Sequence, residues 1–304
     1  MPATIAICTH NRSEYISATI DSVLALVGIE TQDILIIDNA STDNTAQIAM
    51  QYAEEHSNLR VVSEPVLGIA NARNRAIDEA INDAIVFLDD DAIASSGWLQ
   101  AHLRTLEIGY VCSMGPVFLN WQYKKPSWMT ARMESLYSAY NRGASDLDLS
   151  PTDYLLTVNA AFNLQTLRDI GKFDKNLGHQ GRNLYGGEDN DIFQRLYESG
   201  NIVRYTAGAV VVHNVLPERL KVFWIVKRFY YNGIGKSLLN ARSTKSGDRI
   251  VYDLRILIMY ILRLYRPSIS RLCDLAETSG RLVGDLRVFR SEKLLKRYIR
   301  TIDS

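Results

Sequence analysis

The sequence predicts an α/β fold in which a mostly parallel central sheet is covered by helices on both faces. Short runs of consecutive apolar residues, rich in Ile and Val, alternate early in the chain with segments whose apolar side chains recur at helical spacing. Continuous apolar strands are typical of a parallel sheet buried on both faces. At 304 residues, 47% of them apolar, the chain can bury a full-size core and an appendage.

The first strands and helices follow one another in regular order. The predicted strands are Ala3–Cys8, Asp33–Ile37, Leu59–Ser63 and Ala84–Leu88, and the predicted helices are Ile16–Leu24, Ser41–His56 and Ala70–Ala84. In the first helix, for example, Ile16, Ile20 and Val23 lie on one face. This order indicates parallel strands joined by covering helices.

Later elements are less regular. A helix is expected around Trp98–Leu106, and Trp121–Ser150 shows no sustained period, so we expect a long, partly helical excursion over the sheet edge. Further strands are predicted at Tyr154–Phe162 and Ala207–Val212, and further helices at Leu164–Ile170 and Glu188–Ser199. From Pro217 onward the chain is predicted to be helical.

Charge and cysteine usage narrow the protein class. The net charge is zero, but residues 217–304 hold nineteen Lys or Arg against eight Asp or Glu. The three cysteines, Cys8, Cys112 and Cys273, are odd in number and widely spaced, which fits neither a disulfide framework nor a Cys-based zinc site. The N-terminus lacks a signal-peptide pattern, and no apolar run approaches the roughly 20 residues of a membrane span. We therefore expect a cytoplasmic protein.

Polar side chains follow the predicted strands at four places: Thr9 to Arg12, Asp38, Asp89 to Asp91, and His213. In an open parallel sheet, ligands bind beyond the carboxyl ends of the strands. The four groups are therefore expected to meet at one rim of the sheet, where they would offer carboxylates, an imidazole and an arginine.

The three aspartates predict a metal site. Adjacent carboxylates are costly to hold together unless a cation or hydrogen-bond donors neutralise them. A Mg²⁺ or Mn²⁺ ion bridging a carboxylate and a pyrophosphate would suit hard-cation chemistry, and the imidazole of His213 is an acceptable ligand for Mn²⁺. The alternatives are that one aspartate caps the helix at Trp98–Leu106 and that His213 has a structural role.

An acid pair, Glu188 and Asp189, follows two glycines at the start of a predicted helix. One of these carboxylates could serve as a general base that takes the proton of an attacking hydroxyl. The alternative is that both complement the helix dipole. Two arginines, Arg12 and Arg73, could pair with diphosphate oxygens, or could simply be exposed.

Several ordered segments together resemble a known family. They are Thr9, Asn11 and Arg12; Asp38 with Ser41, Thr42 and Asp43; Gly68 with Ala72, Arg73 and Asn74; Asp89 and Asp91 as an Asp-x-Asp signature; Gly171, Phe173 and Asp174; and Glu188 with Asp189. In order and spacing they resemble glycosyltransferase family 2, the large inverting GT-A group. The resemblance runs from about Ile5 to His213 and implies a Rossmann-like GT-A fold. Beyond it, the residues themselves predict a basic helical C-terminal extension.

The resemblance also implies roles for the matching residues. The nucleotide-binding set would be Thr9, Asn11, Arg12, Asp38, Arg73, Asp89 and Asp90, with Asp38 on the base and Asp89 on the ribose. Asp91 would bind Mn²⁺ or Mg²⁺, with His213 as a more loosely matched second ligand. Asp189 would be the catalytic base, with Glu188 beside it.

The implied organisation has three parts. Residues 1–105 would form the nucleotide-sugar half of the GT-A domain, residues 106–215 the acceptor-binding and catalytic half, and residues 216–304 the basic extension. The implied reaction is inverting transfer of a sugar from a nucleotide-diphosphate donor to a hydroxyl of a polysaccharide, lipid-linked or other glycan precursor. The alternative is a non-catalytic protein of the same fold that binds a nucleotide sugar or a partner.

The sequence departs from the family pattern in two places. Many members have Asp-Asp-Gly-Ser where this chain has Asp38, Asn39, Ala40 and Ser41, so the second acid and the glycine are missing. The Gln-x-x-Arg-Trp pattern of processive synthases is also absent, and we expect a single-transfer enzyme. A sugar-nucleotide pyrophosphorylase is disfavoured because the first loop, Thr9–Glu14, has no glycine or lysine.

The basic tail lies outside the resemblance. Its Arg and Lys residues alternate with Leu, Ile, Tyr and Phe, a pattern that could hold an anionic membrane surface, peripherally on the cytoplasmic face. The alternatives are a helical cap with a solvated face and a homodimer interface. No recognisable nucleic-acid-binding module is present, so nucleic acid is not expected as a partner.

Overall fold

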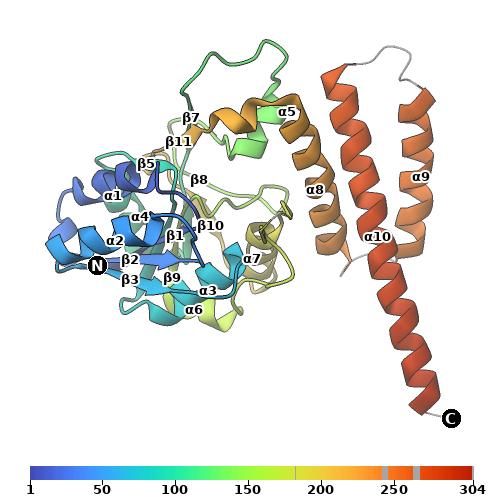
Figure 1. Cartoon of the computed structure of the whole chain (residues 1–304). Coiled ribbons are helices and arrows are strands. Elements are labelled where there is room, and N and C mark those ends of the chain that lie inside the picture. Colours follow the sequence, from blue (N-terminus) through green and yellow to red (C-terminus); the bar gives the residue numbers. More distant parts are fainter. Residues whose placement is uncertain (182, 242–245, 263–267, 303–304) are drawn as a thin grey trace. The chain divides into compact units, whose positions relative to one another are not determined.

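The computed structural model describes residues 1–181, 183–241, 246–262 and 268–302. The chain divides into two compact units. The sheet unit comprises Met1–Asn176 and Glu188–Leu216, and the helical unit comprises Leu177–Gly187 and Pro217–Ser304. Figure 1 labels the elements of both units where there is room.

The sheet unit is built on an eight-stranded and a three-stranded sheet. The strands are β1 (Ala3–Thr9), β2 (Asp33–Asp38), β3 (Leu59–Ser63), β4 (Ala84–Asp89), β5 (Ala92–Ala94), β6 (Cys112–Met114), β7 (Val117–Trp121), β8 (Leu147–Asp148), β9 (Asn159–Asn163), β10 (Val203–Tyr205) and β11 (Val211–Val215). The larger sheet has the order β3-β2-β1-β4-β9-β6-β10-β8, and the smaller one β5-β11-β7. β3, β2, β1 and β4 are parallel, whereas β9 runs antiparallel to β4 and β6. The predicted mixed, mostly parallel sheet is confirmed.

Helices cover both faces of the larger sheet. In the sheet unit they are α1 (Ile16–Leu24), η1 (Ile29–Thr31), α2 (Thr45–Glu55), α3 (Ile69–Glu79), α4 (Trp98–Glu107), α5 (Ala131–Glu134), η2 (Ser135–Tyr137), α6 (Leu164–Asp169) and α7 (Glu188–Glu198). Alternate residues of β1 enter two separate cores: Ile5 and Ile7 pack with α1, α2 and α4, and Ala6 and Cys8 pack with α3, α6 and α7. Burial on both faces explains why Ile5 to Cys8 of β1 are all apolar.

Two predicted strands are displaced along the chain. Residues 154–158 are not a strand; β9 begins at Asn159, because the Thr157 backbone and hydroxyl bond to Asp189 instead of a neighbouring strand. The strand predicted at Ala207–Val212 begins only at Val211, because the carbonyl of Ala209 accepts from the Asn159 side chain. The short strands β5, β6, β7, β8 and β10 were not predicted.

The side chain of Asn159 is the centre of a buried polar network between β9 and α4. Its Oδ1 lies 2.7 Å from the donating Nε1 of Trp98 and 2.9 Å from Nε2 of His102, and its Nδ2 donates to the carbonyl of Pro116 at 2.9 Å. His102 Nδ1 lies 2.8 Å from Ser113 Oγ. His102 is fully buried, and this burial lowers its pKa to about 4, although the Asn159 hydrogen bond opposes the shift.

Acid is expected to destabilise the fold through His102. Its folded pKa is about 4 against 6.5 for the unfolded chain, so the unfolded state binds more protons between these values, and stability falls as the pH drops through this window. The loss should be roughly 3 kcal/mol, at 1.36 kcal/mol per pKa unit. Denaturant titrations across this range should show His102→Gln removing most of this pH dependence. The same change at the half-exposed His56 should leave it in place.

The helical unit contains η3 (Pro217–Leu220), α8 (Val222–Asn240), α9 (Ser246–Leu262) and α10 (Ile269–Ile302). Within it, α10 packs against both α8 and α9 (Figure 1). Glycines allow α8 and α10 to approach closely: a Cβ on Gly280 would lie 1.9 Å from the Tyr230 carbonyl oxygen. Of the helices in the described ranges, none combines the length and the apolar character that a bilayer span requires.

Candidate active site

The carboxyl ends of β1, β2 and β4 bring the first three predicted groups to one rim of the sheet. The register pairs Thr9 with Asp38 and Cys8 with Asp89. Asp38 is 7% exposed, and its Oδ1 has no hydrogen-bond partner among the described residues. A buried carboxylate oxygen without a partner is costly, so this atom is positioned to accept a hydrogen bond from a ligand.

The loops after β1 and β2 are tied to each other beside this rim. Asn11 Oδ1 accepts from the Thr42 backbone at 2.8 Å, and the Asn11 backbone donates to Ser41 Oγ at 3.0 Å. The Arg12 backbone donates to Thr45 Oγ1 at 2.7 Å. The Asn11 side chain is therefore committed to shaping the loops.

Asn39 explains one departure from the family pattern. Its Nδ2 donates to the carbonyls of Glu64 at 3.0 Å and Val66 at 2.8 Å, and its Oδ1 accepts from the Gly68 backbone at 2.8 Å. An aspartate could not make the first two bonds, because an ionised carboxylate has no donor. The amide thus fixes the loop that leads into α3.

Asn39→Asp is expected to lower the free energy of unfolding by about 2 kcal/mol, because a buried carboxylate would face two carbonyl oxygens. Asn39 is 3% exposed, so water cannot compensate. Chemical denaturation near neutral pH would measure the loss. The same substitution at the exposed Asn44 should have little effect, and an equal loss at both positions would contradict the role assigned to Asn39.

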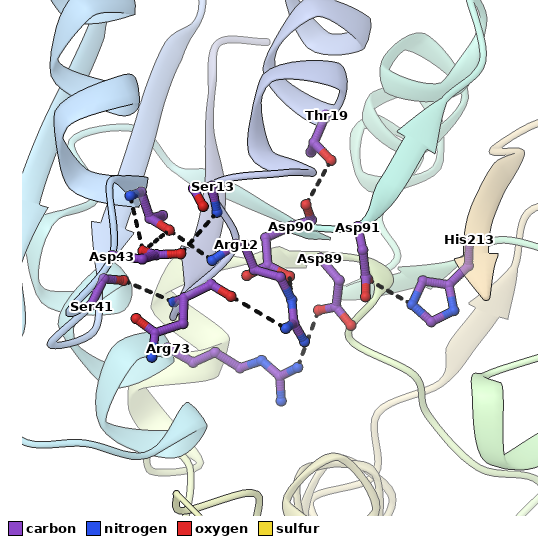
Figure 2. Close-up of polar contacts among 12 residues, drawn as sticks. Arg12, Ser13, Thr19, Ser41, Asp43, Arg73, Asp89, Asp90, Asp91 and His213 are labelled. Atoms are coloured by element: carbon purple, nitrogen blue, oxygen red, sulfur yellow. Dashed lines mark hydrogen bonds and ion pairs between the residues drawn. The ribbon is translucent and has the colours of Figure 1, made fainter. Parts of the chain in front are cut away.

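Asp90 pairs with Arg12. It is not a member of the group formed by Asp89, Asp91 and His213, here called the metal-type group. Its Oδ1 accepts from Arg12 Nε at 3.3 Å, and its backbone carbonyl accepts from Thr19 Oγ1 at 3.0 Å (Figure 2). Burial raises the pKa of Asp90 to about 6, although Arg12 opposes the shift. The three adjacent aspartates therefore have different partners.

Asp91 meets His213 at the centre of the site. Asp91 Oδ1 lies 2.7 Å from His213 Nε2, and His213 Nδ1 lies 2.8 Å from the backbone carbonyl of Tyr137. A carbonyl oxygen can only accept, so we assign the proton to Nδ1, which leaves a lone pair on Nε2 in the neutral ring. This lone pair faces a carboxylate oxygen, and either a second proton or a shared cation makes the contact favourable.

Asp89 completes a group with the chemistry of a divalent metal site. One ligand atom each from Asp89, Asp91 and His213 lies within 4.8 Å of the others. Asp91 and His213 are 3% and 4% exposed, so they hold fixed positions. A histidine that donates its second ring nitrogen to a carbonyl is the usual arrangement for a metal ligand. The residues present therefore fit a hard divalent cation.

Arg73 is surrounded by three carboxylates. Its Nη1 donates to Glu188 Oε1 at 2.9 Å and to Asp189 Oδ1 at 3.0 Å, and its Nη2 lies 3.5 Å from Asp89 Oδ1. The side chain is buried, and its guanidinium carbon lies 5.6 Å from the ring centre of Phe173. Burial opposes the charged form, but the carboxylates raise the pKa of Arg73 above its ordinary value.

The acid pair at the start of α7 has two distinct environments. Thr157 donates to Asp189 through its hydroxyl at 2.7 Å, and through its backbone at 3.3 Å. Glu188 is 7% exposed, and burial together with the charge of Asp189 raises its pKa to about 7, against the effect of Arg73. Asp189 is therefore oriented by three hydrogen bonds, two from Thr157 and one from Arg73.

The structure brings most of the predicted residues together, but the positions of some of them differ from the prediction. His213 does not end a strand of the main sheet; it lies within β11 of the three-stranded sheet and reaches Asp91 from there. Of the two alternatives for Arg73, simple exposure is excluded, because the side chain is buried against carboxylates. Sequence reasoning missed Thr157 and the carbonyl of Tyr137. The only signal for Thr157 in the sequence was its place within the largely apolar run from Tyr154 to Phe162.

The comparison with protein families establishes which family the chain belongs to. The family model described as Glycosyl transferase family 2 matches residues 4–170, more than half of the chain. The chain belongs to glycosyl transferase family 2. It is therefore a glycosyltransferase, and the alternative of a non-catalytic binding protein is not supported.

Relatives of this glycosyltransferase have low sequence identity to it but match most of its length. It is 22% identical to the glucosyl-dolichyl phosphate glucuronosyltransferase of Haloferax volcanii, over 86% of this chain and 85% of that enzyme. S. aureus TarS 1-349 in complex with UDP-GlcNAc shares the fold, with a TM-score of 0.56 and 14% identity over 97% of this chain and 92% of that one.

A second solved structure shows the same fold with a metal. GalNAc-T7 with UDP, GalNAc and Mn²⁺ gives a TM-score of 0.58 and 13% identity, and covers 82% of this chain. The aligned region spans about half of that chain, 51%. These likenesses confirm the predicted GT-A fold for this family 2 glycosyltransferase.

Proposed function

We propose that this glycosyltransferase transfers a sugar from a nucleotide-diphosphate donor to an acceptor hydroxyl with inversion, using a divalent cation and Asp189 as general base. One observation supports this most strongly. A single guanidinium, that of Arg73, contacts both Asp89 of the metal-type group and Asp189. The proposed leaving-group site and the proposed base therefore lie within the span of one side chain.

Asp91 and His213 are the proposed ligands of Mn²⁺ or Mg²⁺, with Asp89 close enough to contribute. When bound, the cation supplies positive charge that stabilises the departing nucleotide diphosphate. The structure of GalNAc-T7, which shares the fold, was solved with Mn²⁺, and this supports the choice of metal. The chain itself supplies the fixed geometry: Tyr137 orients the imidazole, and Asp91 is buried against it.

Asp189 is proposed to accept the proton of the acceptor hydroxyl. The hydrogen bonds from Thr157 and Arg73 hold its carboxylate in one orientation, which a general base requires. An inverting displacement needs one such base, because the acceptor oxygen attacks as the diphosphate leaves. Glu188 is proposed to position Arg73, to which its Oε1 is bonded.

The nucleotide is proposed to lie along the rim formed by β1 and β2. Asp38, with its unpartnered Oδ1, would accept a hydrogen bond from the base. The other proposed contributors to nucleotide binding are Thr9, Asn11, Arg12, Asp89 and Asp90. Asn11 would act through the loop it holds, and Arg12 through the charge it balances against Asp90.

The acceptor is proposed to be a hydroxyl of a glycan or lipid-linked precursor. This rests on the relative from Haloferax volcanii, whose name includes a dolichyl phosphate. We propose that residues 1–105 bind the donor and residues 106–215 complete the acceptor and catalytic half, with residues 216–304 as an extension.

A donor panel tests the proposal. Purified protein should turn over one of a series of UDP, GDP or dTDP sugars with Mn²⁺ or Mg²⁺, and EDTA should abolish the reaction. Asp91→Asn should lower turnover on the order of 100-fold or more, because a metal contributes several kcal/mol of charge stabilisation. Asp21→Asn, which changes an aspartate outside the site, is the control. Full turnover in EDTA, or an unchanged Asp91→Asn, would refute the metal assignment.

A further inference from the structure

Helix α9 places charged residues on its inner side. Arg249 Nε bonds to Asp285 Oδ1 of α10 at 2.8 Å, and Asp253, which is 3% exposed, pairs with Arg281 of α10 at 3.0 Å. These ion pairs fix α9 on α10, which packs along it (Figure 1). The polar side of α9 is therefore already occupied within the helical unit.

The outer side of α9 is apolar. Its exposed large hydrophobic residues are Val251 (51% exposed), Tyr252 (63%), Leu254 (43%), Ile258 (57%), Met259 (45%) and Ile261 (52%). Val251, Leu254, Ile258 and Ile261 recur at helical spacing and form one stripe. A surface helix of a globular protein has the opposite arrangement, with its apolar stripe toward the core. An exposed stripe of this kind marks a site of contact with a membrane or with another protein surface.

The charge around this stripe is basic. Arg255 is the one charged residue on the exposed side of α9 within 249–261. The acidic residues Asp253, Glu277 and Asp285 are buried in ion pairs, whereas Arg290 of α10 is exposed. Nineteen Lys or Arg against eight Asp or Glu over residues 217–304 give the whole segment the same sign. The partner of this face should therefore be apolar and rimmed by negative charge.

We infer that the outer face of α9 binds the surface of a bilayer that contains anionic lipid. The stripe from Val251 to Ile261 lies in the boundary between headgroups and acyl chains, and Arg255 contacts lipid phosphates. A second copy of the chain fits the face less well, because pairing would bring two basic segments together. The inference concerns the helical unit alone and does not depend on the reaction proposed above.

Vesicle flotation tests this inference. The full chain should float with vesicles made of equal parts phosphatidylglycerol and phosphatidylcholine, and less with phosphatidylcholine alone. High salt should reduce the bound fraction, because it screens the basic residues. The double variant Val251→Glu/Ile258→Glu should bind at least about 10-fold more weakly, since it removes apolar contact and adds repulsion. Both positions are exposed, so the fold should be retained.

Two further variants separate the causes. Ile81→Glu is the matched control, because Ile81 is 73% exposed but lies in the sheet unit, and its binding should match the parent. Arg255→Glu should weaken binding to the anionic vesicles and leave binding to phosphatidylcholine unchanged.

The opposite results would overturn the inference. Absence of binding to either vesicle, or binding that the double variant leaves unaltered, excludes α9 as a lipid-binding face. Analytical ultracentrifugation of the same samples provides the remaining outcome. A parent dimer that ignores vesicles and is split by the double variant would show that a second copy covers the face.

Discussion

Replacing Asp189 with asparagine is expected to lower kcat on the order of 10²–10⁴-fold, because an amide cannot accept the proton of the attacking hydroxyl. The substitution should leave the site in place. The amide oxygen can still accept from the Thr157 hydroxyl and from Arg73, which lie 2.7 and 3.0 Å from Oδ1, and only the 3.3 Å bond from the Thr157 backbone to Oδ2 is lost. Turnover at saturating donor would measure the loss, and calorimetric titration of the nucleotide with Mn²⁺ should show nearly unchanged affinity.

Two further variants provide comparisons for the loss of kcat in Asp189→Asn. Glu198→Gln, an exposed acid in the last turn of the same helix, should keep full activity. Thr157→Val should lower kcat by about 10-fold with little change in KM, since it removes a donor that only orients Asp189. If Asp189→Asn retained full turnover in folded protein, another group would be the base. If it instead abolished nucleotide binding, its role would be structural.

The first half of the fold could be predicted because local pattern and tertiary structure agree there. In β1, β2 and β4, the runs of consecutive apolar residues are buried on both faces, so the pattern of Ile5 to Cys8 directly reflects its environment. Beyond residue 110 the strands are short. β6 and β10 have three residues each, too few for any period to be recognised.

The candidate site shows the same limit at the level of single residues. The aspartates at the end of β4 could be predicted because a buried strand delivers them to the rim. The contact between Asp91 and His213 could not be derived in the same way, because it depends on the pairing of the short, unpredicted strand β5, which follows Asp91, with β11, which carries His213. The burial of Arg73 depends on Asp189, which follows 116 residues later. Such long-range pairings leave no trace in the local spacing of residues.

Arg73→Met is expected to destabilise the fold by about 3–5 kcal/mol near neutral pH, because it leaves buried carboxylates without their counter-charge. The loss should shrink as the pH falls. With Arg73 present the pKa of Glu188 is already about 7, and without it the folded-state pKa rises further above the unfolded value of 4.5. The folded variant then binds more protons than the unfolded chain, so lowering the pH stabilises it relative to the parent.

Arg75→Met provides the matched comparison on the same helix. Arg75 is 41% exposed and pairs with Glu79 one turn away, so its loss should cost about 0.5 kcal/mol or less. Urea unfolding of both variants at neutral and mildly acidic pH would distinguish two roles for Arg73. If adding Glu188→Gln partly restores the free energy of unfolding, and if the loss becomes smaller in acid, the guanidinium balances ionised carboxylates. A loss independent of pH and of Glu188 would instead assign its effect to packing on Phe173.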